Sequence, residues 1–234
     1  MASVFWVILL GLIHPIVAQN SIVSDTEVAL IQTNRPQSSV VWHMSRNVPH
    51  VALTFDDGPD EIVTPKLLTV LREYNVKATF FLVGHMIAKA PHIVQQITQD
   101  GHQIANHTWA HYRLDEMTQD QVNLQISSTH RAVKDINQPI MPYVRPPGGR
   151  FNNYVIHATK RQNMTLVMWD VNAADYKTAD GQLPDPKAIA RRVIRKTRPG
   201  SIILMHNGPA TVDALPQIIT EIKNKSLSIG LLQW

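Results

Sequence analysis

The chain has 234 residues, of which 44% are hydrophobic and 17% are charged. This length suits a single domain, because chains divide into separate cores only above about 250 to 300 residues. The composition excludes a disordered chain and a protein built from repeated membrane spans. The 22 basic and 18 acidic residues are interspersed, so no arm for nucleic acid is indicated. Because cysteine is absent from the sequence, any metal must be held by histidine and carboxylate ligands.

Residues 1–18 contain no ionised side chain, and an apolar stretch runs from Val4 to Ile13. A stretch of this kind, ended by a His-Pro pair and a small residue, is typical of a secretory signal peptide. It is too short for a transmembrane helix. We therefore expect a mature chain that begins near Gln19 and is secreted, extracellular or in the cell wall, without stable membrane insertion. The alternative interpretation is a buried amino-terminal strand or helix.

Residues 19–49 are polar and aperiodic, which indicates an amino-terminal arm that adds a strand around Val40 to Met44. In residues 50–234, short apolar runs alternate with amphipathic stretches, and this alternation is typical of βα units around a parallel sheet. We expect seven strands after the arm, at Val51 to Phe55, Ala78 to Gly84, Gln103 to Asn106, Tyr143 to Arg145, Leu166 to Val171, Ser201 to His206 and Leu227 to Leu232.

The helices between these strands have recognisable ends. Thr64 is expected to cap a helix with Pro65 at its first position. Thr118 and Gln121 have the spacing of a capping box, and the Asp185-Pro186 pair opens a further helix. Two glycines, Gly101 and Gly200, stand where helix ends require a left-handed residue.

Polar side chains that suit proton transfer or metal binding follow the predicted strands. Parallel sheets and barrels place their sites at the carboxyl ends of the strands, so we expect these side chains to meet. They are Asp56 and Asp57 after the first strand, His107 and His111 after the third, Arg145 at the end of the fourth, Asp170, Asn172 and Asp175 after the fifth, and His206 after the sixth.

Each of these patterns alone has a plainer explanation. Asp57 begins an Asp-Gly-Pro sequence that favours a turn, and Arg145 precedes a rigid Pro-Pro-Gly-Gly loop. The spacing of His107 and His111 brings both imidazoles to one side of a helical turn, which suits a shared metal, although such pairs are often surface or core histidines. Their occurrence together at one end of one sheet favours an active site.

Five segments, in order, resemble the motifs of the polysaccharide deacetylases, the NodB-homology family of carbohydrate esterases (family 4). They are TFDDGP, HTWAH, RPPGG, DVNAADY and ILMH, and residues 64–84 also resemble the family. The resemblance covers about residues 51–207. It implies an α/β fold with a distorted (β/α) barrel of about seven parallel strands in a single domain, in agreement with the strand count above.

The resemblance also implies a role for each matching residue. Asp57, His107 and His111 match the ligands of one divalent metal ion, most often Zn²⁺, with Co²⁺ or another transition metal as an alternative. Asp56 matches the general base and Arg145 the residue that orients it. His206 matches the general acid, and Asp175 matches the carboxylate that holds that acid.

Three further residues match positions that bind substrate. Leu204 and Tyr176 match the lining of the pocket for the acetyl methyl group, and Gly148 stands where many relatives have an aromatic residue. Tyr176 replaces the commoner Trp, and Asn207 replaces a frequent Asp. These departures concern the shape of the substrate groove more than the chemistry.

The expected activity is metal-dependent hydrolysis of N-acetyl groups from a polysaccharide that contains N-acetylglucosamine, with release of acetate. Chitin or chito-oligosaccharide, peptidoglycan, another N-acetylated glycan and acetylated xylan remain open as substrates. Two alternatives are a non-sugar amide hydrolase of the same fold and a catalytically inactive glycan-binding pseudoenzyme. We expect a monomer that binds no nucleic acid.

Overall fold

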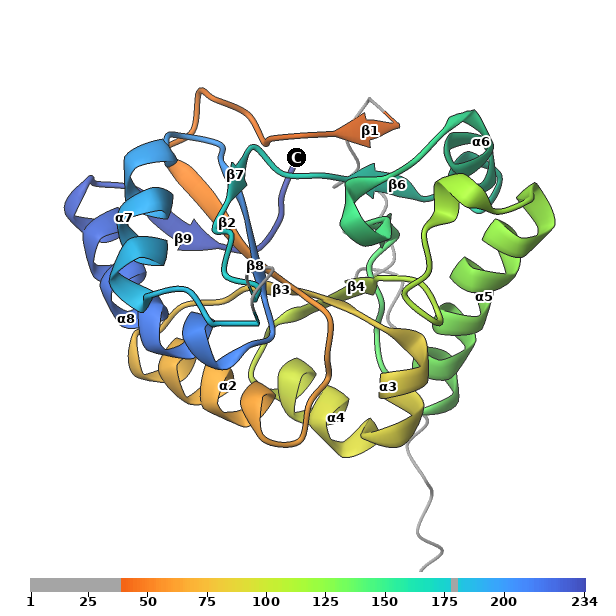
Figure 1. Cartoon of the computed structure of the whole chain (residues 1–234), viewed down its shortest axis with the longest axis horizontal. Coiled ribbons are helices and arrows are strands. Elements are labelled where there is room, and N and C mark those ends of the chain that lie inside the picture. The colour runs from red at the N-terminus through yellow and green to blue at the C-terminus, as the bar shows by residue number, and fades with distance from the viewer. Residues whose placement is uncertain (1–38, 178–180) are drawn as a thin grey trace, which may run out of the picture.

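The structure, a computed structural model, describes residues 39–177 and 181–234. The expected signal peptide, the arm up to residue 38 and residues 178–180 lie outside the described residues. Figure 1 shows the strands at the centre and the helices around them. The strands are β1 (Val40–Val41), β2 (His50–Asp56), β3 (Thr79–Leu82), β4 (Gln103–Asn106), β5 (Tyr143–Val144), β6 (Thr165–Val167), β7 (Val171–Asn172), β8 (Ile202–His206) and β9 (Ser228–Gly230).

All pairings among these strands are parallel, in the order β1-β6-β5-β4-β3-β2-β8-β7, and β9 pairs with the first half of β2. β6 and β7 lie near opposite ends of this order, yet only residues 168–170 separate them in the chain. Because an extended residue spans at most about 3.6 Å, the two ends of the sheet lie close together. The sheet is therefore curled, which confirms the expected distorted (β/α) barrel.

The described residues form nine strands where the sequence predicts seven after the arm. The arm contributes β1, at the position expected for it. The strand predicted from Leu166 to Val171 is divided into β6 and β7, because β6 pairs with β5 and β1 whereas β7 pairs with β8. Residues 168–170 cross between the two ends of the sheet and cannot pair as one continuous strand.

Helices cover the outside of the curled sheet (Figure 1). They are α2 (Val63–Glu73), α3 (Gly84–Lys89), α4 (Pro91–Gln99), α5 (Gln119–Asp135), α6 (Asn153–Arg161), α7 (Pro186–Lys196) and α8 (Pro209–Asn224). Two short 3₁₀ turns lie at Leu114–Glu116 and Pro147–Gly149. Within the described residues, no helix is both long and apolar enough to cross a membrane.

Most of the predicted helix ends are confirmed. Thr118 and Gln121 form the expected capping box at the start of α5. Asp185 caps α7 by accepting a hydrogen bond from the Lys187 amide. Gly101 directly follows the C-cap of α4 and has a φ of 78°, as expected. Gly200 is also left-handed, with a φ of 74°, but its predicted place at a helix end is wrong, because α7 ends at Lys196 and Gly200 lies in the turn before β8.

The predicted cap at Thr64 is wrong. The Asp60 carboxylate accepts hydrogen bonds from the amides of Ile62 and Val63 at 2.8 and 2.7 Å, so α2 begins before Thr64. Thr64 is buried, and its hydroxyl donates to Asn207 Oδ1 at 3.1 Å. The side chain of Thr64 thus connects the start of α2 to the residue after β8.

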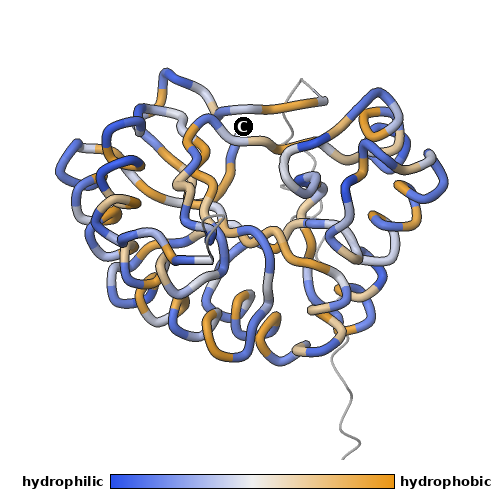
Figure 2. Tube along the Cα trace, in the orientation of Figure 1, coloured by the Kyte–Doolittle hydropathy of each residue, from blue (hydrophilic) through white to orange (hydrophobic). Residues whose placement is uncertain are grey.

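The alternation of side chains along β2 separates an outer core from the barrel interior. Leu53 and Phe55 pack with the helices in the largest hydrophobic cluster, whereas Ala52 belongs to a second cluster. Successive strand residues point to opposite faces, so Thr54 and Asp56 share the inner face with Ala52. Figure 2 shows hydrophobic residues along the strands and mixed hydropathy along the helices, as this layering requires.

The last residues of the chain fill part of the barrel interior. Leu232 is fully buried in the second cluster, together with Phe81 and Tyr143. Trp234 packs against the same cluster, and its indole nitrogen donates to the Tyr143 hydroxyl at 3.0 Å. The segment after β9 therefore supports the strands that carry the polar residues described below.

The contact at Gly200 gives a test of the packing between the arm and the barrel. A Cβ atom at Gly200 would lie 2.5 Å from the carbonyl oxygen of Ser45, whereas one at Gly181, with φ of 80°, would meet no atom within 4 Å. We expect Gly181→Ala to lower the free energy of unfolding by about 1 to 2 kcal/mol through left-handed strain alone. Gly200→Ala should lower it by about 3 kcal/mol or more, because overpacking is added.

Urea unfolding of the two variants and the parent protein measures this difference. Equal losses of unfolding free energy in the two variants would contradict the packing of the arm against Gly200.

Candidate active site

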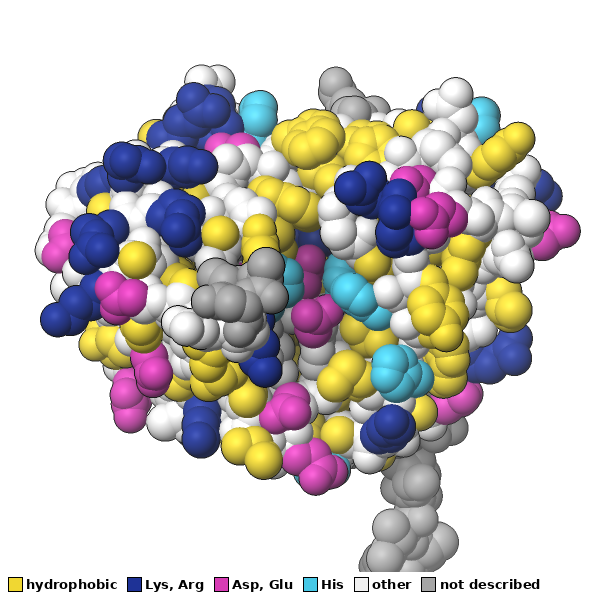
Figure 3. Space-filling model, viewed as in Figure 1, with side chains coloured by type: hydrophobic (Ala, Val, Ile, Leu, Met, Phe, Trp, Pro, Cys, Tyr) yellow, Lys and Arg dark blue, Asp and Glu magenta, His cyan; other side chains and the backbone are white. Residues whose placement is uncertain are grey.

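Polar side chains from several strands meet at the carboxyl end of the barrel. Asp56 ends β2 and His206 ends β8, and these two residues are register partners in adjacent strands. His107 follows β4, and Arg145 follows β5. Figure 3 shows a hollow near the centre of this face in which acidic and histidine side chains gather. The sequence prediction that these residues meet at one end of the sheet agrees with the structure.

Arg145 is fully buried beneath this hollow. Its Nη1 donates to Asp56 Oδ1 at 2.6 Å and to the Thr54 hydroxyl at 2.8 Å. Nε and Nη2 donate to the carbonyls of Val167 and Met168, each at 3.0 Å. A guanidinium can satisfy this many acceptors in fixed directions, and an ammonium cannot. Arg145 therefore fixes the position of the Asp56 carboxylate relative to three strands.

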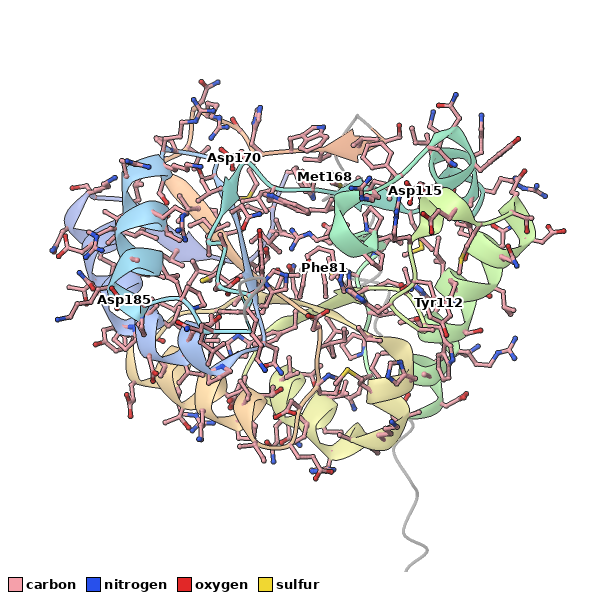
Figure 4. The ribbon with its side chains drawn as sticks, viewed as in Figure 1. Phe81, Tyr112, Asp115, Met168, Asp170 and Asp185 are labelled. Atoms are coloured by element: carbon pink, nitrogen blue, oxygen red, sulfur yellow. The ribbon has the colours of Figure 1, made fainter. Side chains whose placement is uncertain are left out.

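The environment of Arg145 is otherwise apolar. Its guanidinium carbon lies 4.0 Å from the centre of the Phe81 ring. Phe81 and Met168, whose carbonyl accepts from Nη2, are labelled in Figure 4. Burial lowers the pKa of Arg145, and the charge and hydrogen bond of Asp56 oppose that effect. The pair is mutually dependent, because either partner alone would be a buried, uncompensated charge.

Asp57, His107 and His111 form a cluster that could hold a metal ion. One donor atom from each lies within 4.8 Å of the others. The Nε2 atoms of His111 and His107 lie 3.2 and 3.7 Å from Asp57 Oδ1. His107 Nδ1 is 2.8 Å from the carbonyl oxygen of Arg145, an arrangement that directs Nε2 toward the cluster.

Electrostatics favour the form of His107 that binds metals. Burial is the largest influence and lowers its pKa, although Asp56 and Asp57 act in the opposite direction. A neutral imidazole with Nδ1–H donated to a carbonyl presents an unprotonated Nε2. His107 is thus prepared as a ligand by the same residue, Arg145, that holds Asp56.

The expected helical turn between His107 and His111 is wrong. Residues 107–111 form a loop in which Thr108 and His111 have φ values of 67° and 57°. Asn106 holds this loop, because its Oδ1 accepts from the Thr108 amide at 2.8 Å and its Nδ2 donates to the Ile126 carbonyl at 2.9 Å. The loop still brings the two imidazole rings to a centroid distance of 5.0 Å.

His206 is anchored by Asp175 on the opposite side of the hollow. Asp175 Oδ1 lies 2.7 Å from His206 Nδ1, and Oδ2 accepts from the His206 amide at 2.7 Å. The Thr211 hydroxyl also donates to Asp175. Burial opposes protonation of His206, but the hydrogen bond and charge of Asp175, helped by Asp56 and Asp57, raise its pKa above the ordinary value. Burial also acts to raise the pKa of Asp175, and the bonds from His206 and Thr211 outweigh it and lower that pKa.

The three residues expected to bind substrate lie in different environments. Tyr176 is 55% exposed, and its ring stands perpendicular to that of His206 at 5.6 Å. Leu204 is buried in β8, on the same strand face as His206. Gly148 lies in the turn after Arg145 with φ of 63°, and a Cβ atom there would meet nothing within 4 Å.

Asp170 does not join the site. It accepts hydrogen bonds from Arg46, from the Ser201 hydroxyl and from the Ile202 amide, so it lies at the amino end of β8. Figure 4 shows Asp170 apart from Phe81. Asn172 acts within its own loop, where its side chain accepts from the Ala174 amide at 2.7 Å. Of the three polar residues predicted here, only Asp175 reaches the site. Asp170 lies away from it because residues 168–170 cross between the two ends of the sheet.

Sequence reasoning missed three residues that support the site. Thr54 accepts a hydrogen bond from Arg145, Thr211 donates to Asp175, and Arg192 donates to the backbone just before Asp175. Thr54 carried a usable signal, because it is a polar residue on the inner face of an apolar strand. Thr211 and Arg192 lie in helices whose sequence patterns do not distinguish them from neighbouring polar residues.

Comparison with known sequences agrees with this arrangement. A sequence profile described as polysaccharide deacetylase matches residues 43–167. A peptidoglycan-N-acetylglucosamine deacetylase of Bacillus cereus is 38% identical over 184 residues, which cover 76% of this chain and 65% of that protein. The chain thus spans slightly less than two thirds of that relative.

Solved structures share the fold. A peptidoglycan N-acetylglucosamine deacetylase in complex with a substituted N-hydroxybenzamide is 34% identical, with a TM-score of 0.76 over 87% of this chain and 94% of that one. A family 4 carbohydrate esterase pseudoenzyme from Bacillus anthracis is 27% identical, with a TM-score of 0.77 over 82% of this chain and 67% of that one.

The curled parallel barrel, with its Asp-His-His cluster and the anchored side chains of Asp56 and His206, defines a carbohydrate-esterase type of protein. Because the profile matches more than half of the 234 residues, the chain belongs to the polysaccharide deacetylase family.

The buried Arg145 predicts a stability difference between two conservative substitutions. Arg145→Lys keeps the charge but loses the fixed directions of the donors, so several buried acceptors lose their partners. We expect it to lower the free energy of unfolding by about 2 to 4 kcal/mol. Arg150→Lys, at an exposed position, should change it by less than about 0.5 kcal/mol. Denaturant unfolding of both variants checks this, and similar small losses would show that the Arg145 network contributes little.

Proposed function

We propose that this chain hydrolyses N-acetyl groups on the N-acetylglucosamine units of a polysaccharide and releases acetate. The observation that best supports this function is a pair of separately anchored proton-transfer groups beside the Asp-His-His cluster. Asp56 is held by Arg145, and His206 is held by Asp175, on adjacent strands. A protein that only binds glycans needs neither a base nor an acid.

Asp56 is placed to act as the general base. Its Oδ1 accepts the hydrogen bond from Arg145, and its Oδ2 lies 3.7 Å from His107 Nε2, on the side of the cluster. Oδ2 can therefore take a proton from a water molecule that attacks the acetamide carbon. Arg145 contributes by keeping the carboxylate in one orientation throughout this step.

His206 is placed to act as the general acid. Because Nδ1 is engaged by Asp175, the proton on Nε2 of the imidazolium is the one available to the departing sugar nitrogen. The C–N bond breaks as this proton is transferred, and the water oxygen stays on the carbonyl carbon. The products are acetate and a glucosamine unit.

The Asp57, His107 and His111 cluster fits a divalent metal ion. The donor set is one carboxylate and two imidazoles, and one imidazole already has its other nitrogen bound to a carbonyl. Such a set suits Zn²⁺, with Co²⁺ as an alternative. A bound ion would polarise the amide carbonyl and make water a stronger nucleophile at neutral pH.

We further propose that the substrate is an N-acetylated polymer outside the cell, of the peptidoglycan or chitin type. The apolar stretch from Val4 to Ile13 supports export. The similarity to a peptidoglycan deacetylase supports a wall polymer. The open rim at Gly148 and the exposed ring of Tyr176 leave room for a chain that extends beyond one sugar.

The structural similarity to a pseudoenzyme makes a glycan-binding protein the second candidate. Acetate release from chitopentaose, peptidoglycan, acetylxylan and a small acetamide, each with and without chelator, separates the candidates. The proposal requires release from an N-acetylated glycan that stops with chelator. Release from the small acetamide alone would indicate a non-sugar amide hydrolase. No release by metal-loaded protein from any of these substrates would indicate a pseudoenzyme.

Metal binding and catalysis should respond differently to substitution of the two adjacent aspartates. Asp57→Ala, His107→Ala and His111→Ala should each lose both the bound metal and turnover. Asp56→Asn should keep the metal and lose turnover by about 100-fold or more, the usual contribution of a general base. Metal analysis and acetate release on the same samples measure both quantities. Full turnover by metal-free protein in excess chelator would rule out this assignment.

The His206–Asp175 pair predicts a change in the pH profile. Asp175 favours the protonated form of His206 and raises its pKa, so Asp175→Asn should lower that pKa. The acid must be protonated to act, and therefore the alkaline limb of the rate profile should move to lower pH, with a reduced maximal rate. Metal content should not change. Because one limb of a pH–rate profile can reflect the titration of several groups, the test is the comparison of the variant with the parent. An alkaline limb that does not move would show that Asp175 does not influence the protonation of His206.

A further inference from the structure

The loop that carries Asp175 depends on contacts made by its backbone. It begins after β7, where the Ala173 amide donates to the Leu204 carbonyl of β8 at 3.0 Å. Ala174 has a φ of 49°, a left-handed conformation that is unfavourable for a residue with a side chain. Such a conformation persists only where the surroundings hold it. The next residue is Asp175, so the path of Ala173 and Ala174 determines where the carboxylate lies.

Arg192 holds this backbone from α7. Its Nη1 donates to the carbonyl oxygen of Ala173 at 2.5 Å and to that of Ala174 at 3.4 Å. The helix is fixed against the barrel, because Ile189 and Val193 are buried in the same hydrophobic cluster as Ala173. Figure 1 shows α7 beside β7. The guanidinium therefore connects a rigid helix to the two residues that precede Asp175.

The neighbouring residue Arg191 provides a natural contrast. Its side chain is 68% exposed, and its Nη2 lies 3.9 Å from the carboxylate of Asp185, which is also exposed. An exposed pair of this kind contributes little to stability. Both arginines lie in α7 and carry the same positive charge, but only Arg192 contacts the loop that carries Asp175.

We propose that Arg192 is a positioning residue for the general acid, which acts by holding Ala173 and Ala174 so that Asp175 meets His206. This role rests on the proposed deacetylase function. Arg192 touches neither His206 nor the metal-ligand cluster, so it affects the rate through the geometry of Asp175. Loss of the contact lets the loop relax, lengthens the hydrogen bond between Asp175 and His206, and reduces the fraction of His206 that is protonated at high pH.

Substitutions at Arg192 and at its neighbour Arg191 test this role. Arg192→Gln removes the charge and the paired donors, Arg192→Lys keeps the charge with a donor of different geometry, and Arg191→Gln is the matched control on the same helix. We expect Arg192→Gln to lower kcat by about tenfold, the effect of losing one hydrogen bond from a charged donor. KM and metal content should stay at the parent values. The alkaline limb should move to lower pH, because Asp175 is the main group that favours protonated His206, with Asp56 and Asp57 as smaller influences.

The kcat of Arg192→Lys should lie between those of Arg192→Gln and the parent. Arg191→Gln should match the parent in kcat and in pH profile. Guanidinium ion added at millimolar concentration should restore part of kcat to Arg192→Ala and none to Asp175→Asn. This rescue is the deciding measurement if Arg192→Gln unfolds more easily than the parent. Equal loss of kcat in the Arg191 and Arg192 variants, a change in KM alone, or no rescue would each overturn the proposal. An inactive parent protein would instead overturn the deacetylase function itself.

Discussion

The buried guanidinium of Arg145 is the constraint on which the rest of the site depends. A cation inside a barrel is tolerated only when every donor has an acceptor and the charge has a counter-ion. Asp56 supplies the charge, Thr54 and two carbonyls around β6 supply the other acceptors, and Phe81 lies against the guanidinium. The Arg145 carbonyl in turn orients His107. Asp56, the candidate base, and one of the three cluster residues are therefore fixed by the same requirement that keeps the core stable.

Much of the fold and of the site could be predicted from sequence because the signals are local. The apolar runs mark the strands, and the carboxyl ends of parallel strands gather the polar residues that follow them. The remaining features depend on contacts distant in sequence. The loop from His107 to His111 takes its shape from the hydrogen bond of Asn106 to the Ile126 carbonyl. The division of the strand at residues 168–170, and with it the place of Asp170, follows from closure of the sheet, which no local pattern reveals.

Proteins of this fold include both named deacetylases and a pseudoenzyme. The barrel alone therefore does not determine activity, and the proposal for this chain rests on individual side chains and their partners. Here the candidate acid and base each have a dedicated anchor, and the anchors come from separate elements. Asp56 depends on the interior of the barrel, whereas Asp175 depends on α8 through Thr211 and on α7 through Arg192. The anchor of Asp56 and the anchor of Asp175 can thus be altered separately.

The register between β2 and β8 has a consequence for the energetics of proton transfer. Asp56 and His206 are paired positions in adjacent parallel strands, and the backbones of such strands are held about 4.8 Å apart by their ladder of hydrogen bonds. The separation between the two groups is therefore set when the protein folds, before any ligand arrives. Dipoles and charges that are already in place do not have to reorganise as charge moves between them. The cost of arranging the two side chains is included in the folding free energy, and under the proposed function the orientation of the glycan is what remains to be determined on binding.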